Sequence, residues 1–375
     1  MQKFTIKSLA TEKIESELEK IGFDIAYRAQ ASDKFRYKTF KIFDLTLPQA
    51  NILKQTALTF GADCGVHREV LTNKIDKTDV ILGGSFSQLK KICDKLKQQP
   101  FSLKELAENI LLHLEKQERK TKLVGILNIT PDSFSDGGKY FESKEIIKHF
   151  YQLIEDGADM IDIGAESTKP GSSEVSSDEQ IKRLNLLFNE IELSNIEIPL
   201  SVDTRSSKVA RYALENGIKI INDVSGFDFD SNLVDVVAEY NAGVIIQHSS
   251  GTPDIMQEKI EYKDLVDDIY LELKKKAEFA KSKGIDNIIL DIGIGFGKTK
   301  AQNLELLDRI EEFYTLDYPL MVGTSRKSFL GVNDDNNDLK DALTLAINYP
   351  LIQKKVDYLR VHNVKLHKQL LNSAI

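Results

Sequence analysis

The chain has 375 residues, 41% of them hydrophobic and 29% charged, which is enough apolar content for a sizeable core. Its net charge of −8 argues against nucleic acid as a partner, because nucleic-acid-binding surfaces are rich in Lys and Arg. The sequence has no apolar run of the roughly 18 residues that a membrane span needs, and its start lacks the apolar region of a secretory signal. Two cysteines without metal-ligand spacing, Cys64 and Cys93, are typical of reduced thiols. We therefore expect a cytoplasmic protein that binds neither nucleic acid nor membranes.

The first 118 residues predict a small mixed α/β domain. Strand patterns are expected at residues 4–7, 40–45 and 80–82, and helical patterns at 12–21, 48–60, 86–96 and 103–114. Ser85 stands at the N-cap of the third helix, and Ser102 begins a capping box for the fourth. This region carries no convergent catalytic set, and the charged run EKQERKTK at 115–122 marks its boundary. Since single cores rarely grow past roughly 250–300 residues, we expect two domains, 1–118 and 119–375.

From residue 122 onward, short apolar runs alternate with amphipathic helical patterns. The eight runs that predict strands are 123–127, 160–163, 200–202, 218–221, 244–247, 288–290, 320–322 and 356–361. Helical patterns between them include 144–155, 177–189, 208–215 and 262–282, and a capping box begins at Ser177. Eight strand–helix repeats in about 250 residues match a (β/α)8 TIM barrel. An open doubly wound sheet is the alternative, because strand order is not visible in a sequence.

Polar or charged residues follow the end of every predicted strand. They are Asn128, ESTK at 166–169, Asp203, Asn222, Asp223, His248, Asp291, SRK at 325–327, Arg360 and His362. In a parallel barrel all eight C-terminal strand ends open on one face, where such enzymes place their sites. Polar residues at all eight ends are hard to reconcile with a scaffold, so we expect an active site there. The structural alternatives are a helix N-cap for Asp203 and an ordinary solvated strand end for Arg360 and His362.

Seven motifs in a fixed order carry a family resemblance. They are ILNITPDSFSDGG, IGAESTKPGS, SVDTR, INDVSG, DIGIGFGK, GTSRKS and RVHNV. Together they resemble the dihydropteroate synthase family of folate biosynthesis, over residues 123 to about 366. The resemblance implies a pterin-binding barrel that condenses 4-aminobenzoate with (7,8-dihydropterin-6-yl)methyl diphosphate, releases diphosphate, uses Mg²⁺ and is usually a homodimer. It implies nothing about residues 1–118.

The resemblance also implies residue roles for the two ring substrates. A pterin presents an amino-pyrimidinone edge with adjacent N–H donors, which a carboxylate can accept side by side. The residues implied to hold this edge are Asp203, Asn222, Asp291 and Lys327. Ser325 and Lys327 are implied to border the aminobenzoate pocket, with Phe296 as an apolar wall.

The diphosphate leaves readily only when its charge is neutralised. Mg²⁺ keeps several waters and takes few protein ligands, and the resemblance implies that Asn128 is its amide ligand. Thr168, Arg360 and His362 are implied to contact the diphosphate. The arylamine then attacks the methylene carbon, so proximity and electrostatics dominate and no covalent nucleophile is needed. The residues implied for catalysis are Asp203, Lys327 and Arg360.

Some positions depart from the family pattern. Lys169 replaces the usual Arg, Ile292 the usual Pro, and Asn363 the usual Asp of RVHDV. QHSSG replaces a more Met-rich run, which weakens the support for His248. Lys169 supplies one point charge where Arg would fork two hydrogen bonds, so we expect its loop to close less firmly on substrate.

Two other functions fit parts of the pattern. A methyltetrahydrofolate-binding methyltransferase barrel would share the Asp/Asn/Asp pterin set, but it has no need for ITPDSFSDGG, SRK or the Arg/His pair. A catalytically silent scaffold with a partner-binding N-terminal region would have no need for an intact polar set. The sequence therefore favours the synthase.

Overall fold

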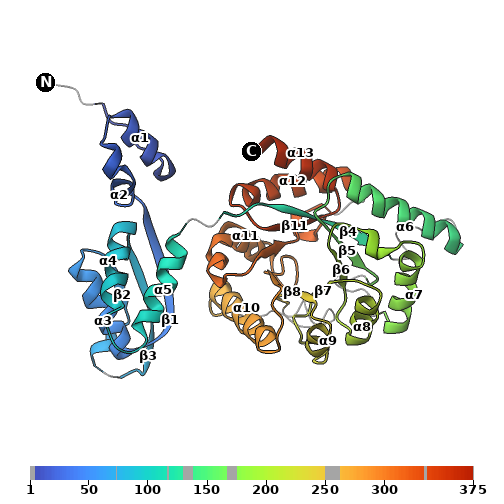
Figure 1. Cartoon of the computed structure of the whole chain (residues 1–375), viewed down its shortest axis with the longest axis horizontal. Coiled ribbons are helices and arrows are strands. Elements are labelled where there is room, and N and C mark those ends of the chain that lie inside the picture. The colour runs from blue at the N-terminus through green and yellow to red at the C-terminus, as the bar shows by residue number, and fades with distance from the viewer. Residues whose placement is uncertain are drawn as a thin grey trace. The chain divides into compact units, whose positions relative to one another are not determined.

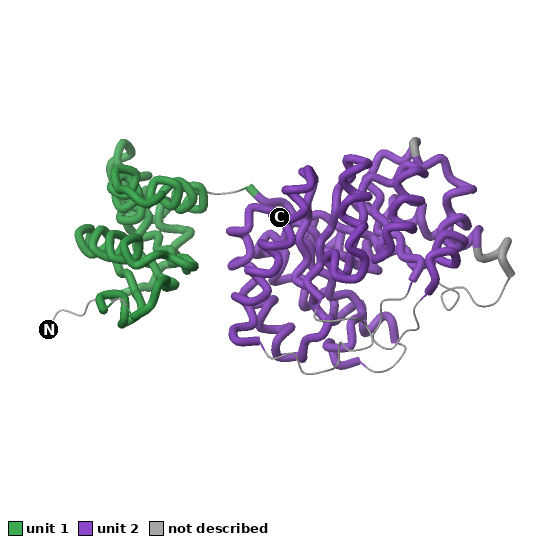
Figure 2. Tube along the Cα trace, turned by 90° about the horizontal axis from the view of Figure 1, so that it is seen from below, with its two compact units in different colours: residues 1–118 green, residues 119–375 purple. Residues whose placement is uncertain are grey.

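Figure 2 shows the two compact units into which the chain divides in the computed structural model, residues 1–118 and 119–375. The structure describes residues 5–72, 74–115, 118–129, 138–166, 175–249, 262–332 and 336–374. Every site residue predicted above falls in the second unit. Within the described ranges, no helix has both the length and the apolar character to cross a membrane.

The second unit is a closed barrel of eight parallel strands (Figure 1). In chain order the strands are β4 (Lys122–Asn128), β5 (Met160–Gly164), β6 (Leu200–Asp203), β7 (Ile220–Asp223), β8 (Gly243–Gln247), β9 (Ile288–Asp291), β10 (Leu320–Val322) and β11 (Tyr358–Val361). Each strand pairs with the next along the chain, and β11 pairs with β4 to close the barrel. The predicted (β/α)8 barrel is confirmed, and the open sheet is excluded.

Helices form the outer ring of the barrel. They are α6 (Gly138–Glu155), α7 (Ser177–Phe188), α8 (Ser207–Glu215), α9 (Leu233–Glu239), α10 (Leu265–Ser282), α11 (Lys300–Asp308), α12 (Asn337–Gln353) and α13 (Val364–Ala374). Their apolar residues recur at helical spacing and pack on the outward side chains of the strands, which builds the main core. The capping box predicted at Ser177 is wrong by one residue. Ser176 is the N-cap of α7, because its hydroxyl accepts from the backbone N–H of Glu179.

The inside of the barrel is stratified. Its floor is a separate apolar cluster of Val124, Met160, Ile220, Ile245, Ile289 and Met321, with Tyr358 against it. Successive side chains on a strand face opposite sides, so the next inward positions lie two residues further along. Two of these eight positions are Ile126 and Gly323, and the other six are polar: Asp162, Asp203, Asn222, Gln247, Asp291 and Arg360. Alternation therefore places a polar layer at the C-terminal end of an apolar floor.

The first unit has a three-stranded antiparallel sheet in the order β1-β3-β2. Its elements are α1 (Ile14–Lys20), α2 (Arg28–Ser32), β1 (Tyr37–Thr46), α3 (Leu47–Thr59), β2 (Asp63–Val66), β3 (Lys77–Ser85), α4 (Phe86–Leu96) and α5 (Leu103–Leu114). In β3, Val80 and Leu82 are buried while Asp79 and Ile81 are exposed, so helices cover one face of the sheet.

Two predictions for the first unit were wrong, and one strand was missed. Residues 5–7 are not a strand, and β2 was not predicted. Ser85 does cap α4, but Ser102 makes no side-chain cap to α5, because its backbone is left-handed, with φ 55°. Cys64 and Cys93 are free thiols, as expected.

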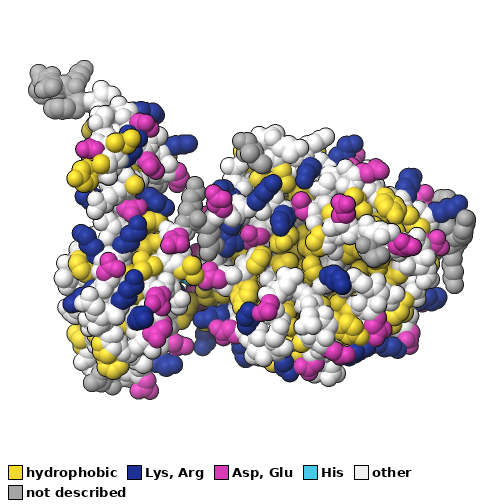
Figure 3. Space-filling view, viewed as in Figure 1, with side chains coloured by type: hydrophobic (Ala, Val, Ile, Leu, Met, Phe, Trp, Pro, Cys, Tyr) yellow, Lys and Arg dark blue, Asp and Glu magenta, His cyan; other side chains and the backbone are white. Residues whose placement is uncertain are grey.

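Basic and acidic side chains are interspersed on the surface of the barrel unit (Figure 3). Many form pairs, such as Lys281 with Asp286 and Lys283 with Asp235. Among the described residues on the face shown, basic side chains form no continuous stripe of the kind that nucleic acids bind.

Candidate active site

An ion-pair cluster centred on Arg360 occupies the polar layer of the barrel. Arg360 donates from Nε to Oδ2 of Asp162 at 2.6 Å and from Nη2 to Oδ2 of Asp203 at 3.1 Å. Asp162 also accepts from Ser201 Oγ at 2.6 Å and from Asn222 Nδ2 at 2.9 Å. Both carboxylate oxygens of Asp162 thus accept from protein donors, and these bonds orient Arg360 and Asn222. The sequence analysis missed it; its signal was an aspartate inside the apolar run MIDIG.

Two oxygen atoms in this layer are buried without a hydrogen-bond partner in the described structure: Asp203 Oδ1 and Asn222 Oδ1. The N-cap alternative for Asp203 is wrong, because Ser206 caps α8 by accepting from the Val209 N–H. A buried polar atom left unpaired costs free energy. These two acceptors lie on neighbouring strands in register, so a ligand with adjacent N–H donors could pair with both.

The charged form of the Asp203 carboxyl is disfavoured in the folded protein. Burial raises the pKa of its carboxyl to about 7, the Asp162 charge adds to the rise, and Arg360 opposes it. A carboxyl whose pKa is higher in the folded than in the unfolded chain contributes stability that is present below about pH 4 and is lost as pH rises towards 7. At neutral pH this residue therefore favours unfolding.

Replacing Asp203 by Asn is expected to stabilise the fold at pH 8. Because the amide never ionises, the variant should gain about 1–2 kcal/mol, or roughly 2–6 °C in Tm. The gain should shrink at pH 5, where folded Asp203 keeps its proton. Thermal unfolding at both pH values tests this, and a gain of equal size at the two would contradict it.

Asp291 and Lys327 influence each other electrostatically in the same region of the barrel. Burial raises the pKa of Asp291, and the Lys327 charge opposes that rise. Burial lowers the pKa of Lys327 to about 8, and Asp291 opposes that shift. Lys327 Nζ donates to the carbonyl of Ile294 and lies 4.3 Å from the centre of the Phe296 ring. The structure thus gathers the predicted residues Asp291, Lys327 and Phe296 around one turn.

His248 follows β8 but does not face the barrel interior. Gln247 holds the inward position, in register with Asp291. The His248 ring lies between Lys298, whose Nζ is 3.0 Å from Nδ1, and Glu272, whose Oε2 is 3.3 Å from Nε2. Burial lowers the pKa of Lys298 to about 7. In its protonated form Lys298 only donates, so His248 Nδ1 then accepts and Nε2–H donates to Glu272.

Lys298 holds the turn after β9 through hydrogen bonds to its backbone carbonyls. Its Nζ also donates to the carbonyls of Gly293 at 2.8 Å and Phe296 at 3.1 Å. Gly293 is required here, because a Cβ would lie 1.8 Å from the carbonyl oxygen of His248 and φ is +68°. His248 therefore contacts the turn after β9 through Lys298, a residue that the sequence analysis did not single out.

Glu166 forms its contacts outside the cluster around Arg360. Its Oε1 accepts from Arg205 Nη2 at 3.1 Å and from the backbone N–H of Val175 at 3.1 Å. The Arg205 guanidinium stacks on Phe229, with 4.2 Å from Cζ to the ring centre. Glu166 thereby joins the two ends of the segment 167–174. Thr168 and Lys169 lie in that segment, outside the residues that the structure describes.

The mouth of the barrel brings Asn128, Ser325 and His362 near one another. Ser325 Oγ accepts from the His362 N–H at 3.1 Å and lies 2.9 Å from His362 Nδ1. Asn128 and His362 border a cavity of about 410 Å³, which Lys148 and His149 of α6 also line. Polar groups from β4, β11 and α6 thus surround a space of ligand size.

The residues at this mouth fit a magnesium ion that arrives with a phosphate. Gly164 leaves room for the Asn128 amide, since a Cβ there would lie 3.2 Å from Asn128 Oδ1. Among the described residues, no group of three or more His, Cys, Asp or Glu side chains is arranged to hold a metal. Mg²⁺ bound by few protein atoms and by substrate phosphates matches such a site better than an all-protein cage.

Known proteins resemble this chain in sequence and in fold. Residues 124–362 match the family model of the pterin binding enzymes. The bifunctional dihydropteroate synthase/dihydropteroate reductase of Helicobacter pylori is 33% identical over 371 residues, which cover 98% of this chain and 97% of that protein. The dihydropteroate synthase of Clostridium beijerinckii is 41% identical over 249 residues, 65% of this chain and 90% of that protein. A dihydropteroate synthase structure from Clostridium difficile, solved in the presence of pteroic acid, superposes with a TM-score of 0.63 at 36% identity, covering 69% of this chain and 99% of that chain. The chain therefore belongs to the dihydropteroate synthase family of pterin-binding enzymes.

Proposed function

We propose that the polar layer of the barrel binds the dihydropterin ring and that the chain joins (7,8-dihydropterin-6-yl)methyl diphosphate to 4-aminobenzoate. The buried, unpartnered oxygens of Asp203 and Asn222 carry this proposal. The amino-pyrimidinone edge of a pterin offers the N–H donors that these acceptors lack, and an asparagine amide can also donate back to a ring carbonyl. Asp291 and Lys327 complete the pterin site.

The proposed reaction needs no covalent enzyme nucleophile. The C–O bond to diphosphate breaks, the C–N bond to the arylamine forms, and the new ammonium loses a proton to solvent. Positive charge develops on the pterin methylene as diphosphate leaves, and the carboxylates of Asp203 and Asp291 are fixed in a buried site where such charge is stabilised. We propose Lys327, Arg360 and Asp203 as the catalytic residues. Ser325 and Phe296 would bind and flank the aminobenzoate.

We propose that the diphosphate leaving group binds at the mouth of the barrel, beside Asn128 and His362. Asn128 would hold Mg²⁺, which supplies charge neutralisation to the diphosphate when bound. Thr168, Arg360 and His362 remain our predicted diphosphate contacts, although Arg360 here donates to Asp162 and Asp203. A cytoplasmic homodimer is also proposed, and sedimentation of the full chain tests the dimer.

Calorimetric titration with 6-hydroxymethylpterin, which cannot react, tests the pterin site. The full chain should bind it with a Kd in about the micromolar range. Asp203→Asn should weaken binding, whereas Asp235→Asn, a surface change in a pair with Lys283, should not. Absence of binding to the wild type would contradict the proposal.

A second activity is proposed because of the first unit. The bifunctional H. pylori protein aligns with 98% of this chain, whereas the C. beijerinckii synthase aligns with only 65%. The first unit is therefore shared with the protein whose name includes dihydropteroate reductase. We infer that this chain also reduces dihydropteroate and that this activity requires residues 1–118.

The fragment 119–375 separates the two activities. Every proposed synthase residue lies in it, so it should keep the synthase kcat within about threefold of the full chain. It should lose reduction of dihydropteroate, assayed with NADPH or NADH and with or without added flavin. A folded fragment without synthase turnover would show that the first unit completes the barrel's function.

A further inference from the structure

Arg326 holds an unusual backbone conformation between two residues of the proposed site. Its φ is +56°, in the left-handed region that residues with a Cβ rarely adopt. Ser325 and Lys327 flank it, and both are proposed to contact substrate. A relaxation of Arg326 to negative φ would turn both neighbours. The left-handed conformation therefore has to be held by other contacts.

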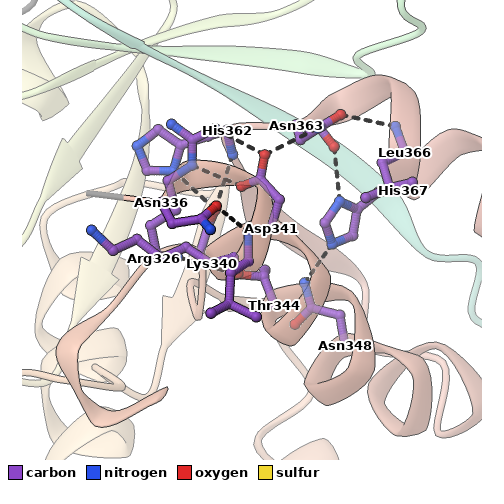
Figure 4. A network of polar contacts seen from close by, with 12 residues as sticks. Arg326, Asn336, Lys340, Asp341, Thr344, Asn348, His362, Asn363, Leu366 and His367 are labelled. Carbon is purple, nitrogen blue, oxygen red and sulfur yellow. Dashed lines mark hydrogen bonds and ion pairs between the residues drawn. The ribbon is translucent and has the colours of Figure 1, made fainter. Parts of the chain in front are cut away.

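A bidentate ion pair between Arg326 and Asp341 of α12 restrains this conformation (Figure 4). Arg326 donates from Nε to Asp341 Oδ1 at 2.7 Å and from Nη2 to Asp341 Oδ2 at 2.9 Å. One helical turn along α12, Thr344 Oγ1 accepts from the Arg326 backbone N–H at 3.2 Å. Asp341 is only 5% exposed. The two parallel hydrogen bonds to Asp341 fix the plane of the guanidinium. The bond to Thr344 fixes the peptide group that carries the Arg326 N–H.

Asn363 fits this arrangement better than the aspartate usual in the family. Its Nδ2 donates to Asp341 Oδ2 at 3.0 Å, and its Oδ1 accepts from the Leu366 N–H at 3.0 Å. An aspartate would place a second carboxylate at hydrogen-bond distance from Asp341 without a proton to share. Burial acts to raise the pKa of Asp341, but the Arg326 fork and the Asn363 donor outweigh it and lower that pKa.

The same network fixes the backbone of Asn363. Thr324 Oγ1 donates to Asn348 Oδ1 at 2.7 Å, and Asn348 Nδ2 donates to His367 Nε2 at 3.0 Å. His367 Nδ1–H is then free to donate to the Asn363 carbonyl at 2.8 Å. The turn after β10, α12 and the start of α13 are thereby joined in one hydrogen-bonded unit (Figure 4).

We propose that Asp341 and Asn363 are positioning residues, which hold Arg326 in its left-handed conformation and so place Ser325 and Lys327 for substrate. The inference rests on the synthase function proposed above. Neither residue contacts substrate; each acts through the turn.

The pair Arg326→Ala and Arg326→Gly tests the inference. Both remove the fork, but only glycine adopts positive φ without a steric penalty. Ala should raise the KM for 4-aminobenzoate by about tenfold with a smaller change in kcat, and Gly by no more than about threefold. Adding Asp341→Ala to the Gly variant should cause less further change than Asp341→Ala alone, because the bonds from Arg326 are already absent and only the bond from Asn363 is lost. Asp338→Ala, an exposed change in the first turn of α12, is the control.

Asn363→Asp supplies an independent test. It should raise the same KM and lower the Tm, and Asp341→Asn should partly rescue it, since an amide then faces the new carboxylate. Equal KM values for the Ala and Gly variants, or strictly multiplicative effects in the 363/341 pair, would overturn the inference. A wild type without turnover would instead overturn the proposed function, so the two failures are distinguishable.

Discussion

An Asp291→Asn variant is expected to bind a non-reactive pterin roughly thirty- to several-hundredfold more weakly than the wild type, equivalent to about 2–4 kcal/mol. Asp291 is buried, and its Oδ1 accepts from the Gly293 N–H at 2.7 Å. The amide would replace one acceptor by a donor and remove the negative charge that opposes the fall in the pKa of Lys327.

Binding of 4-aminobenzoate should change much less in the same variant, by about threefold or less. Separate calorimetric titrations with the pterin and with 4-aminobenzoate measure the two effects. Unchanged pterin affinity would remove Asp291 from the pterin site. An equal loss for both ligands would indicate collapse of the turn after β9 rather than loss of a pterin contact.

The second large effect is expected for Arg360→Met. The substitution leaves Asp162 and Asp203 as buried carboxylates without a cation between them. Removing one partner of a buried ion pair costs about 3–5 kcal/mol of folding stability, and we expect kcat/KM to fall by about a thousandfold or more. Arg360→Lys should fold better than the Met variant but stay poorly active, since an ammonium cannot reproduce the fork.

Arg211→Met is the matched control, because Arg211 pairs with Glu239 on the exposed side of α8. That variant should lose less than about 1 kcal/mol. Denaturant unfolding of the three variants measures the difference. If Arg360→Met is no less stable than Arg211→Met, Arg360 does not compensate the buried carboxylates of Asp162 and Asp203.

The barrel could be predicted because its two periodicities are strong. Buried parallel strands form short apolar runs and the intervening helices repeat at 3.6 residues. Even strand β7 lies only two residues from its predicted start, at Ile220. By contrast, β2 is only four residues long and has the sequence DCGV, which has no strand pattern of its own. Its neighbour β3 creates it by pairing.

The site was predictable where polar residues follow a strand and was missed where they lie within one. Asp162 stands in an apolar run, and only its alternation with Met160 and Gly164 shows that it faces inward. His248 shows the opposite failure. It follows a strand, but the register of β8 makes Gln247 the inward residue, and inward or outward direction depends on pairing that a sequence does not show.

Product formation with stoichiometric diphosphate release is the most direct test of the proposed synthase. The full chain is incubated with (7,8-dihydropterin-6-yl)methyl diphosphate, 4-aminobenzoate and Mg²⁺, and both products are quantified. We predict one diphosphate for each 7,8-dihydropteroate, and no turnover when either substrate or Mg²⁺ is omitted. Diphosphate release without 4-aminobenzoate, or the absence of dihydropteroate under the complete conditions, would contradict the proposed function.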